Sequence, residues 1–184
     1  MQTNPDLLPS LRLLEGAPSI LTALLPLRPI SSVTILPVIG NEASTNLAAF
    51  GDSLAHSMVP VIRIAAVEDR RTRGAWGWVI IELRERQAAV SSLKDMHIVK
   101  ISTLDDNERD WELEGILVGI YSTFFRFNAL EKLEFEVRPV SAPYRPSRSD
   151  IHSWLAGCEM QHLSSWKKNN PSLNTIRLYG HVIS

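Results

Sequence analysis

A short cadence of apolar residues recurs along the chain: one apolar residue, two spacers, a second apolar residue, one spacer and a third. The clearest copy is Leu173/Ile176/Leu178. Four more copies and an incomplete first one share this spacing: Ile30/Val33/Ile35, Val59/Ile62/Ile64, Leu93/Met96/Ile98, Leu130/Leu133/Phe135 and Leu11/Leu14. Self-similarity at intervals of tens of residues is typical of stacked repeat architectures. We therefore expect a repeat array, which usually serves as a binding surface.

Each copy of the cadence ends in a short run rich in β-forming residues. Apolar and polar positions alternate in most of these runs, and a period of two predicts strands with one covered face. The expected strands are Val33–Leu36, Val61–Ile64, Ile98–Ile101, Leu133–Glu136 and Ile176–Tyr179.

Segments with helical spacing lie between the expected strands. Their apolar residues recur at intervals close to 3.6 residues, which predicts amphipathic helices. We expect Ser149 to be the N-cap of the last helix, and Asn169-Asn170-Pro171 to end it. The expected helices are Ser19–Leu25, Asn46–Ser57, Trp78–Arg84, Asp110–Phe125 and Ser149–Lys168.

Strands and helices alternate, and such alternation predicts parallel strands with helices packed on the sheet. The first apolar residues of successive copies lie 19, 29, 34, 37 and 43 residues apart, whereas leucine-rich repeats are about 20–29 residues long. We expect an α/β fold: a leucine-rich-repeat-like βα solenoid with about six parallel strands and helices on its outer face. The copies run from Leu11 almost to Ser184 and leave no room for a cap at either end. Residues 1–184 are thus expected to be one domain, a fragment or degenerate copy of a longer array.

Composition narrows the class of protein. The chain has 184 residues, of which 45% are hydrophobic, and a net charge of -1. This balance predicts a soluble globular protein without a basic field for nucleic acid or a polybasic membrane anchor. No apolar run reaches the ~18 residues of a membrane span, and the first residues lack the basic region of a secretory signal. The single cysteine, Cys158, fits a reducing compartment, so we expect the cytoplasm or nucleus.

One pentapeptide offers an enzymatic alternative. Phe50-Gly51-Asp52-Ser53-Leu54 resembles the nucleophile motif of the GDSL esterases and lipases. A catalytic serine needs a base within hydrogen-bond reach and donors for the oxyanion. That family supplies them from Asp-x-x-His and Gly-x-Asn-Asp blocks, neither of which occurs in this sequence. The residues before Gly51 have helical spacing, which indicates a chance match inside a helix. A GDSL-type serine esterase using Ser53 is the alternative function.

Two groups of residues suggest metal ligands. Cys158 and His162 are four residues apart and would share one helix face, but a structural zinc site needs four ligands and no CxxC or second histidine pair lies nearby. The acidic run 105–114 lacks the alternating ligands and the glycine of a calcium loop. We expect Cys158 to be a core residue and the acids to complement a helix dipole. No metal or cofactor is expected.

A charged segment and two tryptophans follow the third copy of the cadence. Arg70, Arg71 and Arg73 could contact phosphate, but adjacent acids offset their charge and no glycine-rich phosphate loop follows a strand. Nucleotide binding therefore stays a weak alternative. Trp76 and Trp78 could form an exposed aromatic anchor for a protein partner.

The period of two also predicts which residues face away from the helices. The spacer between the last two apolar residues of each copy points outward, and these spacers would form one row across the sheet. Their mixture of charges and hydrogen-bonding groups suits protein recognition. The residues of this expected partner-binding row are Thr34, Arg63, His97, Glu134 and Arg177.

Several segments together resemble the leucine-rich-repeat region of the large F-box protein families of mushroom-forming fungi. They are Leu8–Leu11, Glu15–Ser19, Leu25–Val33, Trp166–Lys168, Asn170–Leu173 and Ile176–Leu178. In such proteins the repeats follow an F-box, which docks on the adaptor of a cullin-type ubiquitin ligase. Only seven residues precede Leu8, so an adaptor is an expected partner only if an upstream F-box exists. The resemblance implies a non-enzymatic protein-recognition scaffold, the substrate-binding part of an F-box protein.

Overall fold

The computed structural model describes residues 11–37, 43–68, 79, 83, 85–86, 90–102, 127–139, 147–157, 159–168 and 170–184. Seven strands lie in this part of the chain: β1 Leu13–Gly16, β2 Ser32–Ile35, β3 Arg63–Glu68, β4 Asp95–Ser102, β5 Lys132–Pro139, β6 Thr175–Leu178 and β7 His181–Ile183. Its helices are α1 Pro18–Leu24, the 3-10 helix η2 Leu25–Leu27, α2 Ala43–Ala55, α5 Arg148–Ala156 and α6 Leu163–Lys167.

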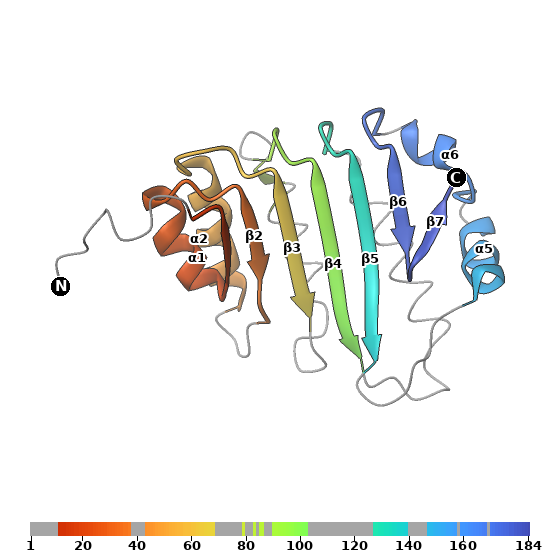
Figure 1. Cartoon of the computed structure of the whole chain (residues 1–184), viewed down its shortest axis with the longest axis horizontal. Coiled ribbons are helices and arrows are strands. Elements are labelled where there is room, and N and C mark those ends of the chain that lie inside the picture. The colour runs from red at the N-terminus through yellow and green to blue at the C-terminus, as the bar shows by residue number, and fades with distance from the viewer. Residues whose placement is uncertain are drawn as a thin grey trace.

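The strands form one sheet whose spatial order equals their order along the chain, from β1 to β7 (Figure 1). Strands β1 to β6 pair in parallel, and only β7 runs antiparallel to its neighbour. The expected α/β class and parallel sheet are therefore confirmed. Each connection advances by one strand in the same direction, which is compatible with a βα solenoid.

The register of the strands corrects the third copy of the cadence. Ile64 pairs with Val33 on one side and Met96 on the other, so the copy is Val61/Ile64/Ala66 and the expected Val59/Ile62/Ile64 is wrong by two residues. Val61 is buried, whereas Ile62 is exposed. The misplacement arose because Ala66 is only weakly hydrophobic, whereas the larger residues Val59 and Ile62 happen to form the same spacing with Ile64.

The same backbone junction recurs before each strand from β2 to β6. The carbonyl of Arg12 accepts hydrogen bonds from the N–H groups of Ser31 and Ser32, both at 3.0 Å. The carbonyls that take this role in later units are those of Ser31, Ile62, Lys94 and Glu131. The units thus start alike although their lengths differ, because the extra residues lie between the strands.

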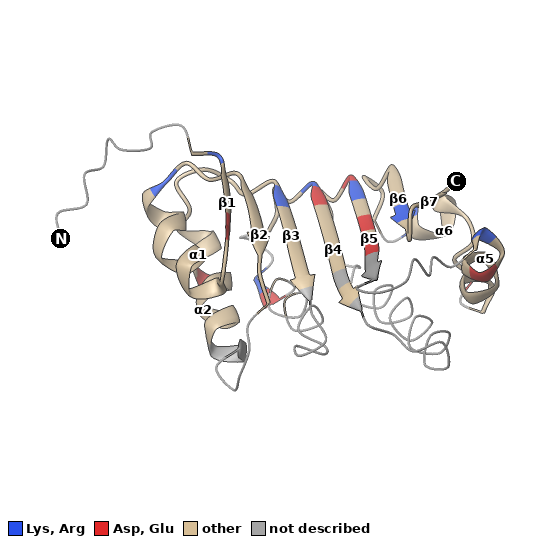
Figure 2. Ribbon diagram, turned by 60° about the horizontal axis from the view of Figure 1, so that its bottom comes forward, with Lys and Arg blue, Asp and Glu red and all other residues tan. Residues whose placement is uncertain are grey.

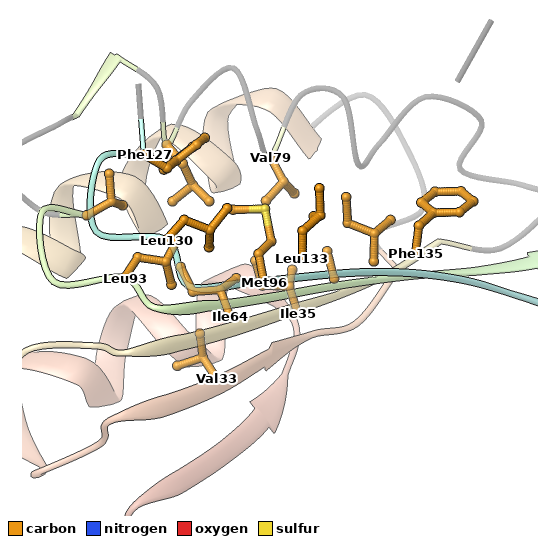
Figure 3. Packing of buried hydrophobic residues seen from close by; sticks show 14 of the residues in the cluster. Val33, Ile35, Ile64, Val79, Leu93, Met96, Phe127, Leu130, Leu133 and Phe135 are labelled. Carbon is orange, nitrogen blue, oxygen red and sulfur yellow. The ribbon is translucent and has the colours of Figure 1, made fainter. Parts of the chain in front are cut away.

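One side of the sheet carries the hydrophobic core (Figure 3). Alternate strand positions such as Val33, Met96, Leu133 and Phe135 are buried there. Helices α1, α2 and α5 add further buried residues to this cluster: Leu21, Leu47, Phe50, Leu54, Ile151 and Leu155. The period of two therefore separates an apolar face from a polar one, as the alternation predicts.

The first two helical segments of the described chain lie where the sequence pattern predicts them. Helix α1 with η2 confirms Ser19–Leu25, and α2 confirms Asn46–Ser57. Leu21 and Leu25 are buried, as expected for residues four apart on one stripe. The expected helix Asp110–Phe125 and most of Trp78–Arg84 fall outside the described residues.

The expected helix Ser149–Lys168 is wrong as a single element, because α5 ends at Ala156 and α6 starts at Leu163. Gly157 is the C-cap of α5, and Glu159 has a positive φ of 57°. The N-cap of α5 is Ser147, not Ser149. Ser147 takes this role because Asp150 lies three residues later and completes a capping box.

A hairpin that the sequence did not predict joins β6 to β7. Tyr179 and Gly180 both have positive φ, 52° and 87°, as in a two-residue type I′ turn. The ring of Tyr179 packs edge-on against Phe135 at 5.2 Å, which holds this unusual residue in the turn. The backbone N–H of Leu163 donates to the carbonyl of Ser184 at 3.4 Å. Strand β7 covers the far edge of β6.

Candidate recognition surface

The strand residues that alternate with the core positions form a second face, which we call the polar face. In the register of the sheet its central part consists of two rows. The first row is Ser32, Arg63, Asp95, Lys132 and Thr175, and the second is Thr34, Ala65, His97, Glu134 and Arg177. Figure 2 shows basic and acidic segments alternating where β3, β4 and β5 begin.

All five residues of the expected recognition row lie on the polar face. Thr34, His97, Glu134 and Arg177 share the second row, as expected. Arg63 does not, because Ala65 occupies the second row on β3 and Arg63 lies two residues earlier, in the first row. This error has the same cause as the misplaced third copy of the cadence.

A chain of ion pairs crosses the polar face from β3 to β6. Arg63 Nε lies 3.7 Å and Lys132 Nζ 4.0 Å from Asp95 Oδ2. Lys132 Nζ also lies 3.0 Å from Glu134 Oε2, and Arg177 Nη1 lies 3.6 Å from Glu134 Oε1. Surface ion pairs contribute only about 0–1 kcal/mol each, so this chain orients side chains more than it stabilises the fold.

Glu134 is the centre of this network. Burial is the largest single influence on its carboxyl and raises its pKa, but the hydrogen bond from Lys132 and the charges of Lys132, His97 and Arg177 together outweigh burial and lower the pKa below its ordinary value. Glu134 is therefore ionised at neutral pH. An ionised carboxylate between two cations keeps Lys132 and Arg177 in place.

Two buried polar atoms on β4 have no hydrogen-bond partner among the described residues: Asp95 Oδ1 and His97 Nε2. His97 Nε2 lies 3.3 Å from Glu136 Oε2. Buried polar groups are normally satisfied. Both atoms have almost no accessible surface, so they belong to the interior of the network and not to the surface that a docked molecule would contact.

The structure places Ser53 inside helix α2, where its hydroxyl is buried and donates to the carbonyl of Phe50 at 2.7 Å. Its neighbours in the pentapeptide have structural roles. Asp52 Oδ1 accepts a hydrogen bond from Arg86 Nε at 2.6 Å. A Cβ on Gly51 would lie only 2.7 Å from Arg86 Cδ, so the glycine makes room for that side chain. The expected helical context of the pentapeptide is confirmed.

Of the two residues considered as zinc ligands, one lies in the described part of the chain. His162 is the N-cap of α6, beyond the end of α5, and Cys158 lies outside the described residues. No group of three or more His, Cys, Asp or Glu side chains is placed to hold a metal ion in the described part of the chain. The acidic run 105–114, the arginines of segment 70–73, and Trp76 and Trp78 also lie outside it.

Sequence reasoning missed two members of the network, Asp95 and Lys132. Each lies two residues before a predicted row member, His97 and Glu134 respectively, and therefore on the same face. The period of two carried the signal that would have found them. Only one residue per copy was assigned to the polar face, so only one of its two rows was predicted.

No family model, curated protein or solved structure matches the chain. Function must therefore be inferred from the geometry of the polar face. Among the helices of the described residues, none is both long and apolar enough to cross a membrane.

Proposed function

We propose that this chain is a non-enzymatic protein-recognition scaffold that binds its partner through the polar face. The observation that carries the proposal is the network of ion pairs from Arg63 to Arg177 on the polar face. Charges held in defined positions favour specific docking over general adhesion. An ordered network also lowers the entropy lost when a partner binds.

We further propose that the architecture is a degenerate leucine-rich-repeat-like βα solenoid. Three observations support it: the chain-order parallel sheet, the register that aligns equivalent residues, and the junction that recurs from Arg12 to Glu131. Solenoids of this kind stack units that contact mainly their neighbours and present an extended binding surface. The polar face of β2 to β6 would be that surface.

The resemblance to fungal F-box proteins extends the proposal to ubiquitin ligases. The chain would then be the substrate-binding repeat region, and contact with the cullin-ligase adaptor would require an F-box upstream in the gene. The intact protein, extended upstream, is expected to recover an adaptor from lysate. Failure to do so would remove the ubiquitin-ligase part of the proposal and leave the recognition scaffold.

Large side chains introduced on the polar face test the proposal that the partner binds there. Thr34→Trp with Thr175→Trp places large side chains on this face without replacing any member of the ion-pair network. Ala49→Trp with Ser164→Trp is the matched control, because these exposed residues lie on α2 and α6. With the chain as bait in a lysate of its own organism, proteins retained by the wild type should be lost from the first variant and kept by the control. Equal retention by both variants would contradict the proposal.

The esterase alternative has its own measurement. The chain is expected not to hydrolyse a short-chain nitrophenyl ester, because Ser53 donates its hydroxyl to a backbone carbonyl inside α2. Turnover that disappears in Ser53→Ala would overturn the non-enzymatic assignment. Ser57→Ala is the matched control, since Ser57 also donates to a nearby carbonyl.

A further inference from the structure

We propose that the partner presents an acidic, extended polypeptide segment to the polar face, where Arg63, Lys132 and Arg177 hold its carboxylates. The inference rests on the proposed recognition function and specifies the chemistry of the partner. The three residues come from different strands, β3, β5 and β6, so the segment would cross the strands.

The cations of the network stand farther out than its acids. The exposed fractions of the side chains are 47% for Arg63, 35% for Lys132 and 45% for Arg177. Those of Asp95 and Glu134 are 24% and 17%. A docking molecule therefore meets ammonium and guanidinium groups first, with the carboxylates beneath them. The network also has three cations for two carboxylates, an excess that an acidic segment would neutralise.

The internal ion pairs leave these cations able to bind further anions. The contacts of Arg63 and Arg177 with their acids, at 3.7 and 3.6 Å, are longer than the ~2.7–2.9 Å of a strong charge-assisted hydrogen bond. A guanidinium has five N–H donors in a planar fork that fits a carboxylate. Each arginine can thus hold its own acid loosely and a partner carboxylate closely.

Other charges near the network leave this cationic layer in place. Glu136 faces His97 at 3.3 Å. Lys94 Nζ and Glu131 Oε1 lie 2.7 Å apart and largely neutralise each other at the edge where the strands begin. Among the described residues, the other acid on this face is Glu15, on β1, two strands away from β3. Among the described residues, Glu136 is thus an acid close to the network and Glu15 a distant one.

The spacing of the cations fits an extended chain. Neighbouring strands lie ~4.8 Å apart, so Arg63 and Lys132, two strands apart in one row, are separated by about 10 Å at the backbone. Side chains two or three residues apart in an extended segment are separated by ~7–10 Å.

Fluorescence anisotropy with defined peptides tests the inference on the full chain. The probes are labelled peptides of about ten residues with alternating Glu-Ser, Gln-Ser or Lys-Ser sequences. The Glu-Ser peptide is expected to bind, and to bind more weakly as salt rises, whereas the other two should not bind measurably. Binding of the Gln-Ser peptide with equal affinity, or preference for the Lys-Ser peptide, would overturn the inference.

Two triple variants that each lose three positive charges distinguish binding at this site from nonspecific electrostatic attraction of the peptide to the protein. Arg63→Gln, Lys132→Gln and Arg177→Gln together should weaken binding of the Glu-Ser peptide by ~10-fold or more. Arg148→Gln, Lys167→Gln and Lys168→Gln remove three exposed cations outside the sheet and should change it by less than ~2-fold. Circular dichroism and melting temperature verify that both fold. Equal losses in the two variants, or tighter binding of a single-stranded oligonucleotide, would refute the acidic-segment site.

The outcomes also distinguish this inference from the proposed function. If Thr34→Trp with Thr175→Trp abolishes retention of partner proteins while the Glu-Ser peptide does not bind, the polar face is a docking surface and only the acidic chemistry is wrong. If blocking that face leaves partner retention unchanged, the recognition function fails whatever the peptides do.

Discussion

The two faces of strands β2 to β6 share one backbone and one set of hydrogen bonds, yet they differ in almost every other respect. The apolar face buries residues such as Leu133 and Phe135 completely. The polar face, on the residue between them, carries Glu134 in a chain of ion pairs. Burial of a large apolar side chain is worth several kcal/mol, whereas a surface ion pair contributes ~0–1 kcal/mol. Stability is thus concentrated on one face, which leaves the composition of the other free for recognition.

The largest expected effect on stability comes from truncating a buried side chain on the apolar face. Phe135→Ala should lower the free energy of unfolding by about 3–5 kcal/mol, because it removes a fully buried ring and leaves a cavity. Denaturant unfolding followed by circular dichroism measures the change. The neighbouring substitution Glu134→Ala should cost no more than about 1 kcal/mol. Similar losses for the two variants would remove the distinction between the faces.

A smaller effect is expected at the turn between β6 and β7. Gly180→Ala should destabilise the chain by about 1–2 kcal/mol, because Gly180 has a φ of 87° that residues with a Cβ adopt at a cost. Nothing lies within 4 Å of the added Cβ, so the loss would come from the backbone alone. Thermal unfolding measures it, and Ser184→Ala, near the same end, is the control. A neutral result at Gly180 would show that the hairpin does not limit stability.

Loss of the helix cap of α5 should cost less. Ser147→Ala is expected to destabilise the chain by about 1 kcal/mol, since the serine hydroxyl accepts from the N–H of Asp150 at 3.2 Å. Helix α5 contributes Ile151 and Leu155 to the core, so the cap supports the apolar side indirectly. Ser153→Ala, at an exposed residue of the same helix, is the matched control and should have a smaller effect on denaturant unfolding.

The same cap predicts a dependence on pH. Hydrogen bonds from the Ser147 side chain and backbone lower the pKa of Asp150. The associated stability is therefore present above the ordinary pKa of an aspartate, ~3.9, and is lost as the pH falls through the lower folded value. Comparison of the acid unfolding of wild type and Asp150→Asn measures this, and the two curves should converge at low pH. A difference that grows at low pH would have the wrong sign.

The smallest effect concerns titration within the polar face. Lys132→Gln should raise the pKa of Glu134, because it removes the hydrogen bond and charge that help to lower it. Carbon-detected NMR titration of the Glu134 carboxyl reports the shift directly. Lys94→Gln is the control, since Lys94 pairs with Glu131 instead. An unchanged pKa in Lys132→Gln would mean that the network does not hold Glu134 ionised.

Local pattern predicted much of the fold because its signals are local. The alternation around Leu133 and Phe135 and the helical spacing of Leu47, Phe50 and Leu54 each depend on neighbours within one element. The same period placed Thr34, His97, Glu134 and Arg177 on one face and in one row. The prediction failed on β3. The correct copy, Val61/Ile64/Ala66, contains a small residue and is less hydrophobic than Val59/Ile62/Ile64, which has the same spacing two residues earlier.

The sequence by itself determined the strands from β2 to β6, the parallel α/β class and the separation of an apolar from a polar face, because periodicity is a property of consecutive residues. Only the tertiary structure decided which charges meet. Asp95 reaches Lys132 and Glu134 reaches Arg177 because parallel pairing aligns residues that are far apart in the chain. The turn at Tyr179 likewise depends on the ring of Phe135 from another strand. The period of two determines which face a residue is on but allows a slip of two residues, as at β3, so the contacts between side chains follow only from the actual pairing of the strands.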